Sequence, residues 1–275
     1  MSYAVIQGSS KGIGLAITRH LLEHTKLRVV ATSSQSSNAA RDAALERLPQ
    51  GSNAEERLFN VQLDVTDESS IQSAQENVVD KLGRNMRLLV NVSGILHAEK
   101  NLSEVDAQSL AKSFQINTFG HLLVYKHFVN LIPERQKKHR DSASIFDDDE
   151  EGDQSSAILP KNRATLVSFS ARVGSIGDNR SGGWYSYRSS KAATNQVVRT
   201  LAHELELRKI PATAFAYHPG TVKTNLSEAY VRGKEIDENK GTFTTEMAAR
   251  KFASVLRGGV QNGAFVDWAG KDVTW

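Results

Sequence analysis

The chain has 275 residues, with 34 lysines and arginines against 31 aspartates and glutamates and a net charge of +3. Hydrophobic residues make up 39% of it, which is enough for a core and excludes general disorder and fibrous structures. The absence of cysteine excludes disulfides, thiolate metal sites and a cysteine nucleophile. With no apolar run of membrane-spanning length and no basic region at the start, we expect a cytoplasmic protein.

Short apolar runs alternate with helical patterns from the first residues onward. The runs predict strands at 3–6, 27–32, 58–63, 86–92, 165–169, 212–217 and 263–266. Helical spacing predicts helices at 12–25, 39–48, 68–82, 113–132 and 185–208. Strands that are apolar on both faces are typical of a parallel sheet covered by helices. The sequence therefore predicts a doubly wound α/β Rossmann fold of about seven parallel strands, with ligands at the carboxyl ends of the strands.

One segment, residues 133–162, breaks this alternation. It begins with basic residues, turns acidic and has few apolar side chains. Such a composition cannot bury enough surface to order itself, so we interpret it as a solvated insertion in a single domain spanning 1–275. A docking segment is the alternative.

A glycine-rich turn follows the first predicted strand and opens the first helix. Glycines let the backbone approach phosphate, and the helix amino terminus offers unpaired N–H groups. The spacing G-x-x-x-G-x-G differs from both the G-x-G-x-x-G fingerprint and a Walker loop. We expect a dinucleotide phosphate here, held by Gly8, Ser10, Lys11, Gly12, Ile13 and Gly14.

The end of the second strand bears on which dinucleotide is bound. An acidic residue at this point accepts hydrogen bonds from the adenosine ribose of NAD and repels the phosphate of NADP. The sequence has Ser33 there and no acid before Asp42, and Lys11 is placed to meet a 2′-phosphate. These residues favour NADP, with NAD as the alternative.

Tyr187 and Lys191 lie four residues apart at the start of a predicted helix, so their side chains share a face. A nearby ammonium favours the phenolate and lowers a tyrosine pKa from its usual value near 10. Tyr187 is then suited to act as general acid in carbonyl reduction. The competing phenol, Tyr185, has Ser189 and not a lysine four residues on.

The series of motifs resembles the short-chain dehydrogenase/reductase family, and the stretch 170–193 resembles its C-factor-like and sniffer-like carbonyl reductase branch. The resemblance implies that Asn117 holds a water in a proton relay to Lys191, and that Lys191 also holds the nicotinamide ribose. It further implies cofactor contacts from Tyr187 and from a set of loop residues that follow the strands, namely Asp64, Val65, Asn91, Ser93, Gly94, Pro219, Gly220, Val222 and Thr224.

The same resemblance implies a serine at the end of the fifth strand that polarises the substrate carbonyl. We assign this role to Ser170, with Ser168 and Ser175 as alternatives. Strict alignment on Arg172 and Gly174 places Ala171 at the position of the family's serine. The polar stretch 225–243 is expected to form a substrate lid, and His97 and Trp184 are candidates to line the pocket or to pack within their loops.

The leading hypothesis is an NAD(P)-dependent oxidoreductase that moves a hydride between the nicotinamide and a small-molecule carbonyl or secondary alcohol. The alternative is a dinucleotide-binding signalling or sensor protein with little turnover. Apolar stripes on the two longest predicted helices, together with the resemblance, imply a homodimer or homotetramer. The basic residues are scattered, so neither nucleic acid nor a membrane is expected as a partner. The stretch 20–24 matches H-x-x-E-H, but it lies on a helix that packs on the sheet, and no metal is expected.

Overall fold

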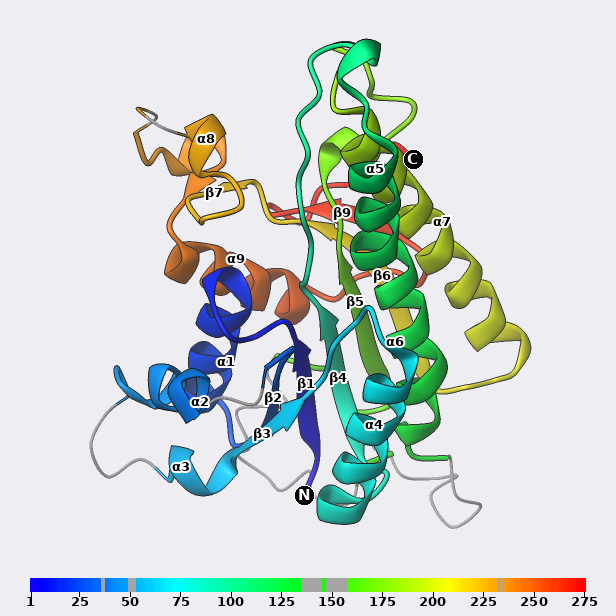
Figure 1. The fold of residues 1–275 in the computed structure, drawn as a ribbon. Helices are drawn as coiled ribbons and strands as arrows, with labels where there is room; N and C mark the ends of the chain where they lie inside the picture. Colours follow the sequence, from blue (N-terminus) through cyan, green and yellow to red (C-terminus); the bar gives the residue numbers. More distant parts are fainter. Residues whose placement is uncertain (36–37, 49–52, 135–144, 147–157, 232, 234) are drawn as a thin grey trace.

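Seven parallel strands form one sheet in the order β3-β2-β1-β4-β5-β6-β9 (Figure 1). The computed structural model describes residues 1–35, 38–48, 53–134, 145–146, 158–231, 233 and 235–275. The prediction of a doubly wound α/β sheet is confirmed. The strands are β1 Tyr3–Gln7, β2 Arg28–Ser33, β3 Leu58–Gln62, β4 Met86–Asn91, β5 Ala164–Phe169, β6 Ala212–His218 and β9 Phe265–Asp267.

Helices cover both faces of the sheet (Figure 1). One face carries α1 (Gly12–His24), α2 (Asn38–Leu45) and α9 (Thr245–Gly258). The other carries α4 (Glu68–Leu82), α6 (Gly120–Phe128) and α7 (Tyr185–Leu207). The remaining helices are α3 (Ala54–Arg57), α5 (Ala107–Phe114) and α8 (Glu228–Val231), with single 3-10 turns at Leu102–Glu104, Val129–Leu131, Arg172–Gly174 and Glu238–Lys240.

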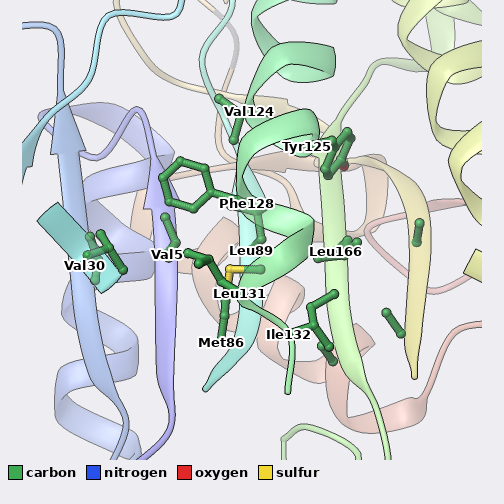
Figure 2. Close-up of a cluster of buried hydrophobic side chains, with 14 of the residues drawn as sticks. Val5, Val30, Met86, Leu89, Val124, Tyr125, Phe128, Leu131, Ile132 and Leu166 are labelled. Carbon is green, nitrogen blue, oxygen red and sulfur yellow. The ribbon is translucent and has the colours of Figure 1, made fainter. Parts of the chain in front are cut away.

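Apolar side chains fill the space between the sheet and the helices on each face. Under α6, strand residues Val5, Leu89 and Leu166 meet Val124 and Phe128, all fully buried (Figure 2). The opposite face packs the remaining inward side chains of the same strands against α1 and α9. Fully burying one such side chain stabilises the fold by roughly 1.5–3 kcal/mol. The two layers fix the strands whose carboxyl ends carry the predicted site.

The predicted helix 113–132 begins six residues earlier than expected and changes its winding. Asp106 caps it, because its carboxylate accepts a hydrogen bond from the Ser109 N–H at 2.8 Å, and α5 follows. A π-helical segment, Gln115–Phe119, then joins α5 to α6. Such segments are rare and occur frequently at functional sites. Asn117 lies within this one.

Several elements went unpredicted in the last third of the chain. The predicted lid 225–243 contains α8 and ends in a two-stranded sheet made by β7 (Thr221–Val222) and β8 (Thr242–Phe243). Helix α9 follows, capped by the Thr244 hydroxyl, which accepts from the Met247 N–H at 3.2 Å. Its buried residues recur at helical spacing, so the signal was present in the sequence.

Described residues at two places in the 133–162 segment are anchored in the protein. Ile145, Phe146, Ile158 and Leu159 are buried, so the prediction of a solvated loop does not hold for them. Fully buried Arg87 of β4 contacts both places, with its guanidinium carbon 4.8 Å from the Phe146 ring centre and one N–H donating to the Leu159 carbonyl at 3.3 Å. Residues 135–144 and 147–157 lie outside the described part of the chain.

Candidate active site

The glycine turn between β1 and α1 has the backbone that only glycine adopts readily. Gly8 and Gly12 have φ of +83° and +58°. A Cβ at Gly14 would lie 2.2 Å from the Gly8 carbonyl oxygen, so the helix approaches the strand more closely than any side chain allows. Ser10 and Lys11 are exposed at this turn, and Ile13 is half-buried. The helix amino terminus and exposed lysine fit a phosphate group.

The ends of β2 and β3 supply the next predicted residues. Ser33 is buried and its hydroxyl donates to the Gln35 carbonyl. Asp64 accepts hydrogen bonds from Thr66, from the N–H at 2.9 Å and from the hydroxyl at 2.7 Å. Val65 lies against α6, where a Cβ on Gly120 would come within 2.7 Å of the Val65 Cβ. These side chains define one wall beside the glycine turn.

After β4 the chain passes close to α7. Ser93 donates its N–H to the Gln7 side chain at 3.2 Å, and its buried hydroxyl has no hydrogen-bond partner among the described residues. A Cβ on Gly94 would lie 3.2 Å from Asn117 Oδ1 and 3.4 Å from Lys191 Nζ. This bare backbone and the orphaned hydroxyl fit a polar ligand that passes between β4 and α7. Asn91 is fully buried beneath them.

Tyr187 and Lys191 lie on the same buried face of α7, as predicted. Lys191 donates its ammonium to the Phe169 carbonyl at 2.7 Å, and its Nζ is 5.9 Å from the centre of the Tyr187 ring. Burial lowers the pKa of Lys191 to about 7 and raises the pKa of Tyr187 to about 12, because desolvation disfavours each charged form. The predicted lowering of the Tyr187 pKa by the nearby ammonium is therefore wrong for the cofactor-free protein, in which desolvation raises this pKa.

Asn117 joins α5 and α6 to the loop after β4 and to α7. Its side-chain oxygen accepts from the Ile95 N–H at 2.8 Å, while its amide donates to the Ile95 carbonyl at 2.9 Å and to the Ser190 hydroxyl at 3.0 Å. The Thr194 hydroxyl donates to the Asn117 carbonyl at 2.6 Å. The π-helical segment thereby brings Asn117 next to Lys191.

The three candidate serines near the end of β5 have different surroundings. Ser170 donates its hydroxyl to Asn195 at 2.5 Å. Ser168 is fully buried in a network with His121 and Tyr125. The Ser175 hydroxyl accepts from the Asp178 N–H at 3.0 Å. Ala171, directly after Ser170, precedes the 3-10 turn and is buried.

The segment after β6 closes over the glycine turn. Gly220 has φ +79°, and a Cβ there would lie 2.7 Å from the Phe243 ring, so this turn packs on β8. The Thr224 Cγ2 lies 3.6 Å from where a Cβ on Gly12 would be. Val222 is buried, and Pro219 and Thr224 are half-buried. Of the predicted residues of this segment, Thr224 therefore lies beside the predicted phosphate site, while Gly220 and Val222 pack against other parts of the protein.

Sequence reasoning missed two features around these residues. His121 is fully buried between the Ser168 hydroxyl at 3.0 Å and the Ser93 carbonyl at 2.9 Å, and burial lowers its pKa to about 3. Buried Glu99 accepts hydrogen bonds from the Ser186 hydroxyl and N–H at the start of α7. A histidine on an apolar helix and an isolated glutamate give no local signal of such partners.

The structure offers no support for a metal at the H-x-x-E-H stretch. The His20 and His24 rings lie 4.4 Å apart, and His24 is 3.6 Å from the Glu23 carboxylate. Within the described residues, no group of three or more histidines and carboxylates is arranged to hold a metal ion. In the same part of the chain, every helix is too short or too polar to cross a bilayer.

Comparison with known proteins decides the family. The short chain dehydrogenase family model matches residues 2–139. The chain belongs to the short-chain dehydrogenase family. It is an oxidoreductase of that family, and its predicted motif series extends beyond the matched region to Lys191 and Thr224.

Individual members of the family align along most of the chain. A dehydrogenase of 1-hydroxy-2-glutathionyl-2-methyl-3-butene from Rhodococcus sp. is 26% identical over 84% of this chain and 82% of its own. C-signal of Myxococcus xanthus is 27% identical, over 68% of this chain and 92% of its own. The NADPH-bound carbonyl reductase from chicken fatty liver matches with a TM-score of 0.76 and 26% identity, covering 99% and 98% of the two chains. The carbonyl reductase Sniffer of D. melanogaster shares the fold, at a TM-score of 0.78, 21% identity and full coverage of both chains. The resemblance to this branch of the short-chain dehydrogenases is confirmed.

Proposed function

We propose that this short-chain dehydrogenase transfers a hydride between NADP and a carbonyl or secondary alcohol of a small molecule. The observation that carries the proposal is the buried pair on α7, with Lys191 Nζ and Asn117 converging on the bare backbone of Gly94. The glycine turn at the start of α1 would hold the phosphates of the dinucleotide, and Gly94, Asn117 and Lys191 would hold its nicotinamide end beside Tyr187. The reduced nicotinamide, when bound, supplies the hydride.

The protein's own groups then handle the proton. Tyr187 donates its hydroxyl proton to the carbonyl oxygen as general acid, and takes it back in alcohol oxidation. Lys191 in its ammonium form favours the resulting phenolate, and the same ammonium binds the nicotinamide ribose. Asn117 fixes the loop after β4 and holds the water that returns a proton to Lys191. Ser170 orients the carbonyl by donating a hydrogen bond, for which its hydroxyl turns from Asn195.

The preference for NADP rests on charge at the adenosine end. Buried Ser33 ends β2 in place of an acid, and Lys11 is exposed at the glycine turn. A 2′-phosphate therefore meets a lysine and no carboxylate at this point. Lys11→Ala is expected to raise the KM for NADPH about tenfold and to leave the KM for NADH nearly unchanged.

The decisive experiment is Tyr187→Phe. We expect NADPH-dependent reduction across a panel of aldehydes and ketones to fall at least about a hundredfold, because the general acid is lost. NADPH binding, followed by its fluorescence, should change little. Tyr185→Phe removes the neighbouring phenol and serves as the matched control, with activity retained. Undiminished reduction by Tyr187→Phe contradicts the proposal.

A second candidate function is a dinucleotide-binding sensor with little turnover. It is favoured by the end of β5, where Ala171 carries no hydroxyl and the hydroxyls of Ser168, Ser170 and Ser175 are already hydrogen-bonded. Tight NADPH binding with no reduction of any carbonyl in the panel would establish it over the enzyme.

We also propose that α6 and α7 meet a second copy of the chain. Phe119, at the end of the π-helical segment, and Leu122 of α6 are about half exposed. A groove of about 1270 Å³ between the outer faces of α6 and α7 is lined by Leu122, Val197 and Leu201 among others. Leu122→Glu should convert the homo-oligomer to monomers in light scattering. A wild-type monomer contradicts this assignment.

A further inference from the structure

The residue immediately before α7 has a backbone conformation that its side chain disfavours. Trp184 has φ +54° and ψ +44°, in the left-handed region. Gly182 and Gly183 before it have φ of +62° and +66°, which cost glycine little. A bulky residue in this region is an outlier, and such strain persists only where the surroundings enforce it. A third glycine would therefore fit the backbone angles at this position better than the tryptophan that occupies it.

The loop after β4 provides the first restraint on Trp184. The Trp184 N–H donates to the carbonyl of Glu99 in this loop at 2.6 Å. The Glu99 carboxylate in turn accepts from Ser186, from the hydroxyl and from the N–H at 3.4 Å. Glu99 is 6% exposed, so these bonds are shielded from water. The same residue thus binds Trp184 through its backbone and the start of α7 through its side chain.

Arg188 provides the second restraint, from within α7. Its Nε donates to the carbonyls of Gly182 at 3.1 Å and Gly183 at 3.0 Å. Its Nη1 donates to the Val173 carbonyl at 3.2 Å. One planar guanidinium therefore fixes the left-handed turn and ties it to the segment that follows β5.

These restraints place the indole against the catalytic phenol. The Trp184 and Tyr187 rings are 6.2 Å apart between centres, at an interplanar angle of 68°. Lys191 lies one turn further along α7 in the opposite direction and faces Gly94 and Asn117, where the ribose is proposed to bind. Trp184 therefore precedes Tyr187 at the start of α7, while Lys191, beside the proposed ribose position, follows it. The indole offers an aromatic surface beside the Tyr187 ring for a carbonyl compound that reaches the Tyr187 hydroxyl.

We propose that Trp184 is a specificity-determining residue that favours carbonyl compounds whose carbonyl carbon carries a flat aromatic group. The inference rests on the proposed function, because it takes Tyr187 as the proton donor to the substrate. An indole held rigidly offers a large apolar surface at low entropy cost, and aromatic rings gain from edge-to-face or offset packing beyond the area they bury. We expect a preference of about tenfold over a saturated ring of similar size.

Two matched substrates separate this role from a structural one. Benzaldehyde and cyclohexanecarbaldehyde present the same reacting group on a flat and on a puckered ring. The kcat/KM ratio of benzaldehyde to cyclohexanecarbaldehyde with NADPH should be about tenfold higher for the wild type than for Trp184→Gly, because the intrinsic difference in reactivity between the two aldehydes is common to both proteins. Trp184→Phe should keep most of the wild-type ratio. Glycine accepts the left-handed backbone, so Trp184→Gly relieves strain and is expected to fold.

A neighbouring aromatic residue supplies the control. Tyr185→Ala removes a 44% exposed ring one residue away and should leave the ratio unchanged. A Trp184→Gly protein that keeps the wild-type ratio, or that loses activity toward both aldehydes equally, overturns the proposal, since a merely structural residue affects both substrates alike.

Binding distinguishes this proposal from the proposed function. Calorimetric titration of the NADP-loaded Tyr187→Phe protein with acetophenone and with cyclohexyl methyl ketone needs no turnover. The aromatic ketone should bind about tenfold more tightly, and the difference should disappear when Trp184→Gly is added. Equal affinities overturn the role of Trp184, whatever the activity measurements give. If the wild-type protein reduces no carbonyl compound while the binding preference for the aromatic ketone is retained, only the proposed reductase function is contradicted.

Discussion

Two groups of buried polar side chains lie next to each other at the carboxyl ends of β4 and β5, and they are built differently. In the His121 cluster, made of Tyr125, Ser168, His121 and the Ser93 carbonyl, the hydrogen bonds form a chain. The Ser93 carbonyl only accepts, so His121 carries its proton on Nε2, and Ser168 donates to Nδ1. Tyr125 donates to Ser168. Each donor in this chain has an acceptor.

The Lys191 cluster, made of Tyr187, Lys191, Asn117 and Ser190, is satisfied only in part. Of the three donors on the Lys191 ammonium, one has an acceptor among the described residues, the Phe169 carbonyl. Burial disfavours the charged forms of both Tyr187 and Lys191. A buried polar network that is fully satisfied rigidifies a core, whereas unused donors cost stability and remain available to a ligand. The satisfied His121 cluster therefore supports the fold, whereas the unused donors of the Lys191 cluster suit the chemistry that we propose for it.

The largest expected effect comes from Lys191→Met, and its two parts have opposite signs. Turnover should fall at least about a hundredfold. Stability of the cofactor-free protein should rise at neutral pH. Burial lowers the pKa of Lys191 to about 7 from 10.5, so wild-type stability is reduced below pH 7 and recovers as the pH approaches 10.5, by up to about 1.4 kcal/mol per pH unit.

Urea unfolding at pH 6, 8 and 9.5 measures this effect. The variant should be a few kcal/mol more stable than the wild type at pH 6, with the gap shrinking as the pH rises. Lys100→Met removes the same charge from an exposed position and controls for the change in net charge. If the difference in the free energy of unfolding between Lys191→Met and the wild type does not change with pH, the destabilising buried charge is not that of Lys191.

The next largest effect is expected for His121→Ala. This variant should lose stability, whereas Lys191→Met should gain it. The variant leaves the Ser168 hydroxyl and the Ser93 carbonyl without their partner and opens a cavity, at a cost of about 3 kcal/mol. Urea unfolding measures the loss, and kcat should change less than for Lys191→Met. His127→Ala removes a half-buried histidine whose ring nitrogen pairs with exposed Glu68, and it should cost clearly less than His121→Ala, about 1 kcal/mol. Equal costs for the two histidines would remove the distinction between the clusters.

The two clusters also differ in how far the sequence predicts them. Tyr187 and Lys191 share a helix face, so their spacing alone places them together, and the apolar runs predict the strands that carry the loops. The His121 cluster joins residues from β5, α6 and the loop after β4, and only the packed fold brings these together. The same holds for Asn117, whose approach to Lys191 depends on a π-helical segment that apolar periodicity does not indicate. Helix α9 is different, because its cap and its apolar spacing are readable in the sequence.

A smaller effect is expected for Ser170→Ala, at the serine that directly follows Phe169, whose carbonyl accepts from Lys191. If Ser170 orients the carbonyl, kcat should fall about tenfold or more, because a hydrogen bond that strengthens in the transition state is lost. Ser175→Ala and Ser168→Ala are the comparisons, with Ser168→Ala acting mainly on stability through the His121 cluster. Steady-state kinetics with NADPH measures all three. A larger fall in kcat for Ser175→Ala would transfer the role to Ser175.

The smallest effect is expected at the outer end of the His121 cluster, for Tyr125→Phe. Tyr125 donates to Ser168 at 2.8 Å, so the variant removes one donor while Ser168 still donates to His121. Ser168 loses the donor at one acceptor position and the Asn91 side chain loses its hydrogen bond to the Tyr125 hydroxyl, but neither loss leaves a buried charge. Stability should fall by about 1 kcal/mol, with kcat and NADPH affinity unchanged. A double-mutant cycle with Ser168→Ala should give a coupling of similar size, because the two hydroxyls act through the same bond. If the single variant lowers kcat as well, the His121 cluster takes part in the chemistry and the separation between support and catalysis fails.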